Sequence, residues 1–201
     1  MPPEPTLVTV LRHGQTAGRA HVFRGAQDDP LSDAGRAAMA AALTRLDAPP
    51  CDRIAASPRT RCREAAAHHA QTRGVPLTLL EGFREMAFGA WEGLTPDEAA
   101  LRDPELYARF RDHACAAPGG ESLAGLRARV ATAWQDWLAD ADGGHRLLVT
   151  HAGVMRALLM DLIGLPEGHV WRIALPECGH FRISHLAGHA PVLLHLNACA
   201  A

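Results

Sequence analysis

Residues 6–16 read Thr-Leu-Val-Thr-Val-Leu-Arg-His-Gly-Gln-Thr, and this stretch decides the fold. Its first six residues are an apolar run rich in β-branched side chains, bounded by Pro5 and Gly14, which predicts a short buried strand. A second apolar run, at 146–150, is followed by His151. Each of these two predicted strands ends at a histidine, and a glycine follows the histidine within two residues. The pattern predicts a sheet whose reactive side chains lie together at one edge.

Around these two strands, short apolar runs alternate with helical patterns. Further strands are expected at 51–56, 75–80, 181–186 and 192–196. Helices are expected at 32–46, 57–73, 96–112, 123–141 and 153–163. The helix at 32–46 has Ser32 or Asp33 as its N-cap, and the helix at 57–73 has Ser57 as cap and Gly74 as its stop signal. Residues 81–93 are expected to form an irregular loop.

Strands that alternate with helices predict an α/β fold: a three-layer α/β/α sandwich with a mostly parallel sheet. The hairpin expected from 181–186 and 192–196 adds an antiparallel edge. We expect a single domain over 1–201, with a helical excursion at about 94–118 that breaks near Asp103-Pro104.

The charge balance points to a small-molecule ligand. The chain has 201 residues, with 20 basic against 22 acidic side chains and a formal net charge of -2 at pH 7. Such a chain has no general attraction for nucleic acid or for an anionic membrane, so neither is expected as a partner. A homodimer remains compatible with the sequence. The unusual feature of the composition is the 12 histidines.

Cysteine usage and the absence of targeting signals favour the cytoplasm. The five cysteines are odd in number and contain no C-x-x-C pair, which disfavours a disulfide framework or a zinc ribbon. Residues 1–5 lack the pattern of a signal peptide, and the apolar region 147–165 is interrupted by charged side chains. We therefore expect a reduced cytoplasmic protein.

Ligands of parallel sheets bind at the carboxyl ends of the strands, which here are Arg12-His13-Gly14 and His151-Ala152-Gly153. Each histidine lies near the start of a helix or turn, where free amide groups attract anions. Because Arg12 and Arg61 are expected close by, the expected ligand is an anion of the size of phosphate. A neutral imidazole is also a good nucleophile toward phosphorus.

The chain resembles the histidine phosphatase superfamily, which has the phosphoglycerate mutase-like fold. The resemblance starts with Leu11-Arg12-His13-Gly14-Gln15-Thr16, followed by Asp29-Pro30-Leu31-Ser32-Asp33-Ala34-Gly35. Four further blocks come in the family's order: Ser57-Pro58-Arg59-Thr60-Arg61-Cys62, Arg84-Glu85-Met86-Ala87-Phe88-Gly89-Ala90-Trp91-Glu92-Gly93, Gly119-Gly120-Glu121-Ser122 and Val149-Thr150-His151-Ala152-Gly153-Val154. Within the superfamily, the stretches at 23–31 and 88–93 are most similar to α-ribazole phosphatases.

The resemblance implies a role for each matching residue. His13 would be the nucleophile that becomes phosphohistidine, with its other ring nitrogen held by a backbone carbonyl. Glu85 would be the general acid and base, with Glu81 and Glu92 as rivals. The phosphate would be held by Arg12, Arg61 and His151, and Gln15 is a candidate substrate contact. No cofactor or metal is expected.

Two assignments remain open: the residue that replaces an asparagine phosphate contact, and the role of His180. The superfamily usually has an asparagine where this chain has Arg19, so that phosphate contact would fall to Arg19 or to Arg24, which we favour. His180 is the one C-terminal histidine that could approach the pocket. The remaining histidines, His68 and His69 included, fit no metal-ligand spacing and are expected at the surface or in packing.

The resemblance implies a metal-independent phosphomonoester hydrolase. The leading substrate is α-ribazole 5′-phosphate, in the assembly of the cobalamin nucleotide loop. The alternatives are a broad-specificity sugar phosphate or phosphoglycerate phosphatase, a phosphoglycerate mutase, and a non-catalytic phosphate-binding module. The retention of Arg12, His13, Arg61, Glu85 and His151 argues against the last of these.

Overall fold

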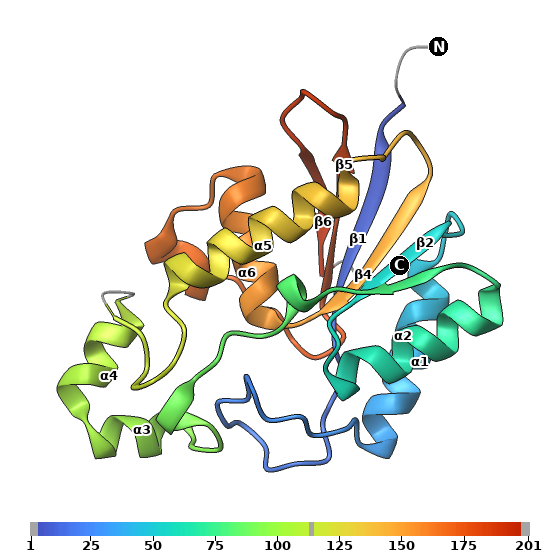
Figure 1. The fold of residues 1–201 in the computed structure, drawn as a ribbon. Helices are drawn as coiled ribbons and strands as arrows, with labels where there is room; N and C mark the ends of the chain where they lie inside the picture. Colours follow the sequence, from blue (N-terminus) through green and yellow to red (C-terminus); the bar gives the residue numbers. More distant parts are fainter. Residues whose placement is uncertain (1–3, 113–114, 198–201) are drawn as a thin grey trace.

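The computed structural model describes residues 4–112 and 115–197. Its centre is a six-stranded sheet in the order β3-β2-β4-β1-β5-β6 (Figure 1). The strands are β1 (Thr6–Arg12), β2 (Arg53–Ala56), β3 (Leu77–Leu79), β4 (His145–Thr150), β5 (His180–His185) and β6 (Val192–Leu196). Strands β1 to β4 are parallel to one another, whereas β5 runs antiparallel to β1 and β6 antiparallel to β5. The predicted mostly parallel sheet with an antiparallel edge is confirmed.

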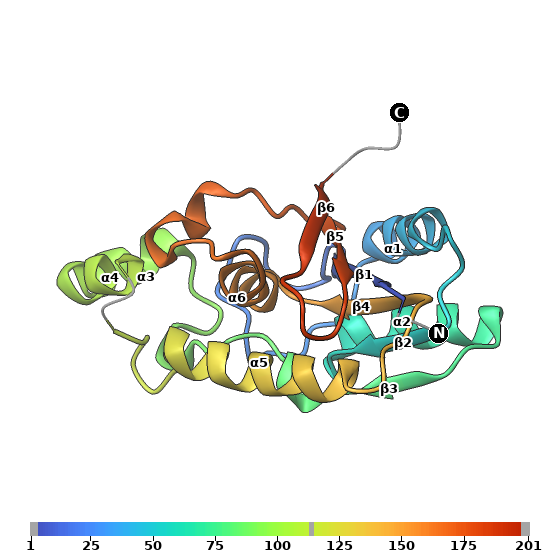
Figure 2. The same ribbon diagram turned by 90° about the horizontal axis from the view of Figure 1, so that it is seen from above.

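Helices cover both faces of the sheet, because successive strand residues point to opposite sides. Val8 and Val10 of β1 pack in one core with α5 (Leu123–Leu138) and α6 (Ala152–Ile163). Leu11 points the other way and packs in a second core with α1 (Asp33–Leu46) and α2 (Thr60–Arg73). Figure 2 shows the sheet between the two layers. The predicted three-layer sandwich is confirmed.

The helix ends follow the expected capping chemistry with one exception. Ser32 caps α1, and its hydroxyl accepts a hydrogen bond from the Gly35 amide at 3.0 Å. Gly74 closes α2 in the left-handed conformation at φ 67°, where a side chain would be strained. The expected start of α2 at Ser57 is wrong. The Ser57 amide donates to the Val149 carbonyl at 3.0 Å and extends the pairing of β2 with β4, so the helix begins only at Thr60.

The helical excursion consists of α3 (Pro96–Arg102) and α4 (Pro104–Arg111), and the break at Asp103-Pro104 is confirmed. Both helices lie away from the sheet, beyond α5 and α6 (Figures 1 and 2). Phe110 of α4 attaches the excursion to the body of the protein through contacts with Phe23, Phe88 and Trp91, with ring centroids 5.0–6.3 Å apart. These rings lie next to the carboxyl ends of the strands.

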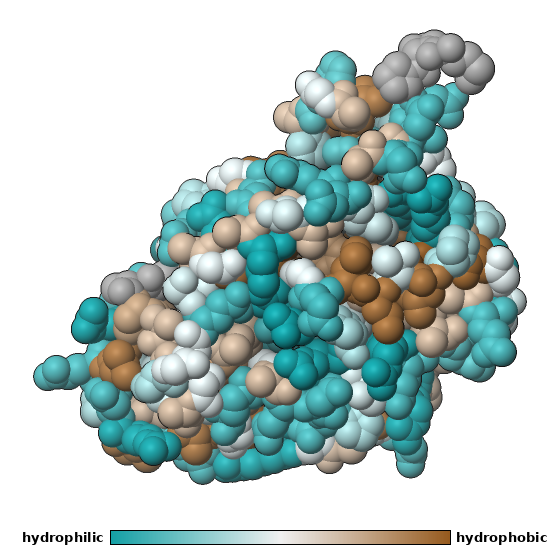
Figure 3. Space-filling model, in the orientation of Figure 1, coloured by the Kyte–Doolittle hydropathy of each residue, from teal (hydrophilic) through white to brown (hydrophobic). Residues whose placement is uncertain are grey.

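Three 3₁₀ turns complete the described structure. Two of them, Glu81–Phe83 and Gly89–Trp91, lie in the segment expected to be irregular, and the third, Glu167–Arg172, lies where no element was predicted. Among the described residues, no helix is long and apolar enough to cross a membrane. The face shown in Figure 3 is mostly hydrophilic, with scattered hydrophobic patches.

Candidate active site

His13 lies directly after β1, at the carboxyl edge of the sheet, and is 8% exposed. Its Nδ1 lies 2.8 Å from the Gly14 carbonyl oxygen. A carbonyl oxygen can only accept, so Nδ1 carries the proton and the neutral ring has its lone pair on Nε2. Burial lowers the pKa of His13 to about 3, helped by the positive charges of Arg61, Arg12 and Arg24. His13 is therefore neutral at pH 7, which is the form that a nucleophile requires.

Arg12 and Arg24 line the same cavity as His13. Arg12 donates from Nη1 to the Leu175 carbonyl at 2.6 Å, while its buried Nε has no hydrogen-bond partner among residues 4–112 and 115–197. Arg24 is held by Asp29 through an ion pair of 2.7 Å. A buried guanidinium donor without an acceptor is costly, and an anionic oxygen in the cavity would satisfy it.

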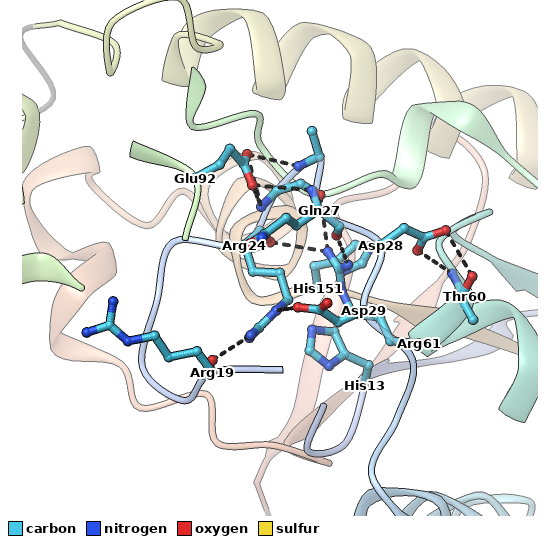
Figure 4. A network of polar contacts seen from close by, with 12 residues as sticks. His13, Arg19, Arg24, Gln27, Asp28, Asp29, Thr60, Arg61, Glu92 and His151 are labelled. Atoms are coloured by element: carbon cyan, nitrogen blue, oxygen red, sulfur yellow. Dashed lines mark hydrogen bonds and ion pairs between the residues drawn. The ribbon is translucent and has the colours of Figure 1, made fainter. Parts of the chain in front are cut away.

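Arg61 and His151 lie behind His13 rather than on the cavity wall (Figure 4). Arg61 is fully buried and donates to the carbonyls of Arg24, Gly25 and Gln27 at 2.6–3.2 Å. Its Nε also donates to Nδ1 of His151 at 3.3 Å. The positive charge of the guanidinium therefore disfavours protonation of His13, and its hydrogen bonds hold the loop at 24–27.

The orientation of His151 follows from these contacts. Because Nδ1 accepts from Arg61, the neutral ring carries its proton on Nε2, which donates to the Ser57 hydroxyl at 2.8 Å. The ring packs edge-on against His13, with centroids 5.2 Å apart. Burial lowers the pKa of His151 well below its ordinary value. His151 thus fixes the position of the His13 ring.

Glu85 lies across the cavity from β1 and is anchored at the start of α6. Its Oε2 accepts from the Gly153 amide at 3.1 Å, and its Oε1 accepts from the Met86 amide at 2.9 Å. The two rival carboxylates have other partners. Glu92 accepts from the amides of Gly25, Ala26, Gln27 and Phe88, and the largely exposed Glu81 pairs with Arg84. Of the three carboxylates, Glu85 is the one that lines the cavity with His13.

Three candidates lie away from His13. Gln15 accepts from the Ser32 hydroxyl at 2.8 Å, at the start of α1. Arg19 extends away from His13 and pairs with Glu98 at 2.9 Å, so of the two arginines Arg24 reaches the cavity (Figure 4). His180 packs against His195, with ring centroids 5.5 Å apart, and is absent from the described cavity lining.

The cavity has a volume of about 340 Å³ and continues away from His13 between the loops and the helical excursion. Its wall is mostly apolar and includes Phe23, Phe88, Phe110, Leu123, Leu126 and Val170. Arg156 of α6 adds a positive charge, donating to the Val170 carbonyl at 3.3 Å and lying 4.6 Å from the Trp171 ring centroid. Sequence reasoning missed Arg156. The sequence signal that could have found it is an arginine between the apolar residues of 152–160.

The buried neutral histidines make the protein sensitive to acid. An unfolded histidine titrates at about 6.5, so the stability from folding His13 as a neutral ring is complete above that pH and is lost as the pH falls toward 3. We expect the free energy of unfolding, measured in urea, to fall by on the order of a few kcal/mol between pH 7.5 and 4.5. Between the same two pH values, a His13→Asn variant should lose less of its free energy of unfolding, and the exposed His68→Asn variant should lose as much as the wild type. Equal losses in all three proteins would contradict the assignment of the acid sensitivity to His13.

A neutral histidine and a carboxyl group face one cavity that arginines also line, at the carboxyl edge of a mostly parallel sheet, and this arrangement suits the chemistry of phosphate esters. Comparison with known families makes the assignment specific. The chain belongs to the histidine phosphatase superfamily (branch 1), whose model matches residues 8–198.

Relatives with different substrates in their names match similarly well. The chain is 32% identical over 191 residues to a glucosyl-3-phosphoglycerate phosphatase of Mycolicibacterium vanbaalenii, covering 90% of this chain and 84% of the relative. It is 30% identical over 177 residues to an adenosylcobalamin/alpha-ribazole phosphatase of Salmonella typhimurium, covering 87% and 84%. Among solved structures, YhfR of Bacillus stearothermophilus has a TM-score of 0.85 at 28% identity, covering 94% of this chain and 95% of the other.

Some relatives are much longer. The chain is 32% identical over 176 residues to the bifunctional protein Rv2228c of Mycobacterium tuberculosis, covering 85% of this chain but only 48% of that protein. The chain therefore spans about half the length of that relative.

Proposed function

We propose that the protein hydrolyses phosphomonoesters through a phosphohistidine on His13. The observation that carries the proposal is the Nδ1–Gly14 hydrogen bond, because it leaves the Nε2 lone pair of a neutral ring for attack. The unpartnered Nε of Arg12 supports a phosphate in the same cavity. The protein's partner is then a small phosphorylated molecule.

In the first step, Nε2 of His13 attacks phosphorus and the P–O bond to the alcohol breaks. Protonated Glu85 gives its proton to the leaving oxygen. In the second step, Glu85 takes a proton from water, the water oxygen attacks phosphorus, and the P–Nε2 bond breaks to release inorganic phosphate. Arg12 and Arg24 offset the charge on the phosphoryl oxygens, and Arg61 adds positive potential from behind.

As the leading substrate we propose α-ribazole 5′-phosphate, which would place the enzyme in cobalamin biosynthesis. The cavity wall beyond the phosphate site carries Phe23, Phe88 and Phe110, which can pack against an aromatic base. The similarity to the Salmonella enzyme supports the same choice. We also propose a cytoplasmic location, because the described cysteines, Cys51, Cys62, Cys115 and Cys178, are all free thiols. Cys199 lies outside the described residues.

A second candidate is a phosphorylated hydroxy acid such as glucosyl-3-phosphoglycerate. Arg156 favours it, because its guanidinium lines the cavity and donates to a neutral acceptor, the Val170 carbonyl, at 3.3 Å. A substrate carboxylate could take that place. The similarity to the Mycolicibacterium enzyme points the same way.

A panel of phosphomonoesters tests both candidates. Phosphate release is measured for α-ribazole 5′-phosphate, glucosyl-3-phosphoglycerate, 3-phosphoglycerate and glycerol phosphate, with the wild type and an Arg156→Met variant. If the first candidate is right, α-ribazole 5′-phosphate has the highest kcat/KM. If the second is right, the carboxylated esters lead, and Arg156→Met lowers their kcat/KM by roughly 10- to 100-fold with little effect on glycerol phosphate. Formation of 2-phosphoglycerate in place of free phosphate would instead indicate a mutase.

A further inference from the structure

Three potential metal ligands meet at the end of the molecule opposite the catalytic edge. Asp47 is the C-cap of α1, Cys51 lies in the loop before β2, and His69 lies in the last turns of α2. One ligand atom of each lies within 4.8 Å of the others. All three residues are at most 9% exposed. We call this group the α1–α2 corner.

The imidazole of His69 is the least satisfied member of the corner. Its side chain is 10% exposed, and its Nε2 has no hydrogen-bond partner among the described residues. Its Nε2 makes one long ion-pair contact, of 3.4 Å, with Oδ2 of Asp47. A buried ring nitrogen that lies within 4.8 Å of a carboxylate oxygen and a thiol, with only this long contact to the carboxylate among the described residues, is an arrangement that a bound metal ion would complete.

We propose that the α1–α2 corner is a binding site for a divalent cation of the zinc class, held by Asp47, Cys51 and His69 with water as the fourth ligand. Oxygen, sulfur and nitrogen together are a donor set that Zn²⁺ accepts. Bonds of about 2.0–2.3 Å place tetrahedral ligand atoms roughly 3.3–3.8 Å apart, so the corner needs to contract by only about 1 Å. The Cys51 thiol gives its proton to solvent as the metal–sulfur bond forms.

The charges of the corner are compatible with this ion. A thiolate and a carboxylate together neutralise Zn²⁺. Arg73 pairs with Asp47 Oδ2 at 2.7 Å, and its positive charge opposes a cation. Its side chain is 42% exposed, so it can turn toward water. It can also stay on the carboxylate as an outer partner of a metal ligand, which is a common arrangement.

The position of the site indicates a structural role. Asp47 and Cys51 lie in the short connection between α1 and β2, and His69 lies in α2, so a bound ion would tie this connection to the neighbouring helix. The catalytic histidine lies at the opposite edge of the sheet, and the proposed phosphatase chemistry does not use this ion. Metal binding can therefore be tested independently of the proposed function.

Titration of the metal-free protein with Co²⁺ is the test, because a Co²⁺–thiolate bond has a charge-transfer band in the near ultraviolet. We expect the band to saturate at one equivalent and to disappear when Zn²⁺ is added. Cys51→Ala and His69→Gln should abolish it. Cys178→Ala and His68→Gln, which change the same residue types outside the corner, should keep it.

Thermal unfolding gives a second readout. At free Zn²⁺ about 100-fold above its Kd, the folded state is favoured about 100-fold, which for a chain of this size raises the Tm by about 5–10 °C. The His69→Gln variant should show no rise, and its activity on p-nitrophenyl phosphate serves to show that it is folded. A wild type that gives no Co²⁺ band overturns the proposal, as does a band that survives in both Cys51→Ala and His69→Gln.

Discussion

The His13→Ala variant is expected to lose at least about 10⁴-fold in kcat on p-nitrophenyl phosphate. The variant lacks the imidazole whose Nε2 carries a lone pair at the cavity wall, and the covalent route is lost with it. His151 cannot substitute, because Arg61 and Ser57 occupy its two ring nitrogens and it lies behind the wall. Phosphate release under saturating substrate measures the effect.

The fold should survive this change. The ring contributes one hydrogen bond, to the neighbouring Gly14, and a matching circular dichroism spectrum would show that the loss is chemical. The exposed His68→Ala variant is the matched control and should keep the wild-type rate. If His13→Ala released phosphate at the wild-type rate, the assignment of His13 would be wrong.

The Glu85→Gln variant is expected to slow alkyl phosphates by about 10²- to 10⁴-fold but p-nitrophenyl phosphate by less than about 10-fold. A poor leaving group needs the proton that Glu85 donates, whereas p-nitrophenolate leaves without it. Gly153→Ala should act in the same direction, because a Cβ at Gly153 would lie 2.2 Å from Glu85 Oε1 and displace the carboxylate. Steady-state kcat on both substrates gives the ratio.

The Glu92→Gln variant distinguishes a role of this carboxylate in proton transfer from a role in ordering the loop. Glu92 accepts from four backbone amides, so its replacement should lower the free energy of unfolding and reduce activity on both substrates alike. Equal losses on the two substrates for Glu85→Gln would contradict its role as the acid. A preferential loss on alkyl phosphates for Glu92→Gln would move that role to Glu92.

Much of the fold was predictable because strand and helix patterns reflect local burial. β1 and β4 form as their apolar runs predict, and they bring His13 next to His151. The start of α2 was mispredicted because Ser57-Pro58 has the local chemistry of a helix cap, while the tertiary pairing of Ser57 with Val149 keeps the chain extended. Sequence spacing cannot reveal such a pairing.

The arrangement within the site was less predictable. A resemblance assigns Arg61 and His151 to the phosphate, but only the three-dimensional contacts show that both are fully buried beside His13 and absent from the described cavity lining. Arg156 and the α1–α2 corner were missed because their partners come from distant segments. Cys51 and His69, for example, are separated by the whole of β2 and most of α2.

Trapping of the phosphoenzyme tests the central proposal most directly. The wild type is mixed with ³²P-labelled phosphomonoester and quenched within its first turnover, and the labelled peptide is identified. We predict close to one phosphoryl group per chain, stable to alkali, labile to acid and located on His13, with no label in His13→Ala. Turnover by the wild type with no labelled protein, or with the label on another residue, would contradict a phosphohistidine mechanism at His13.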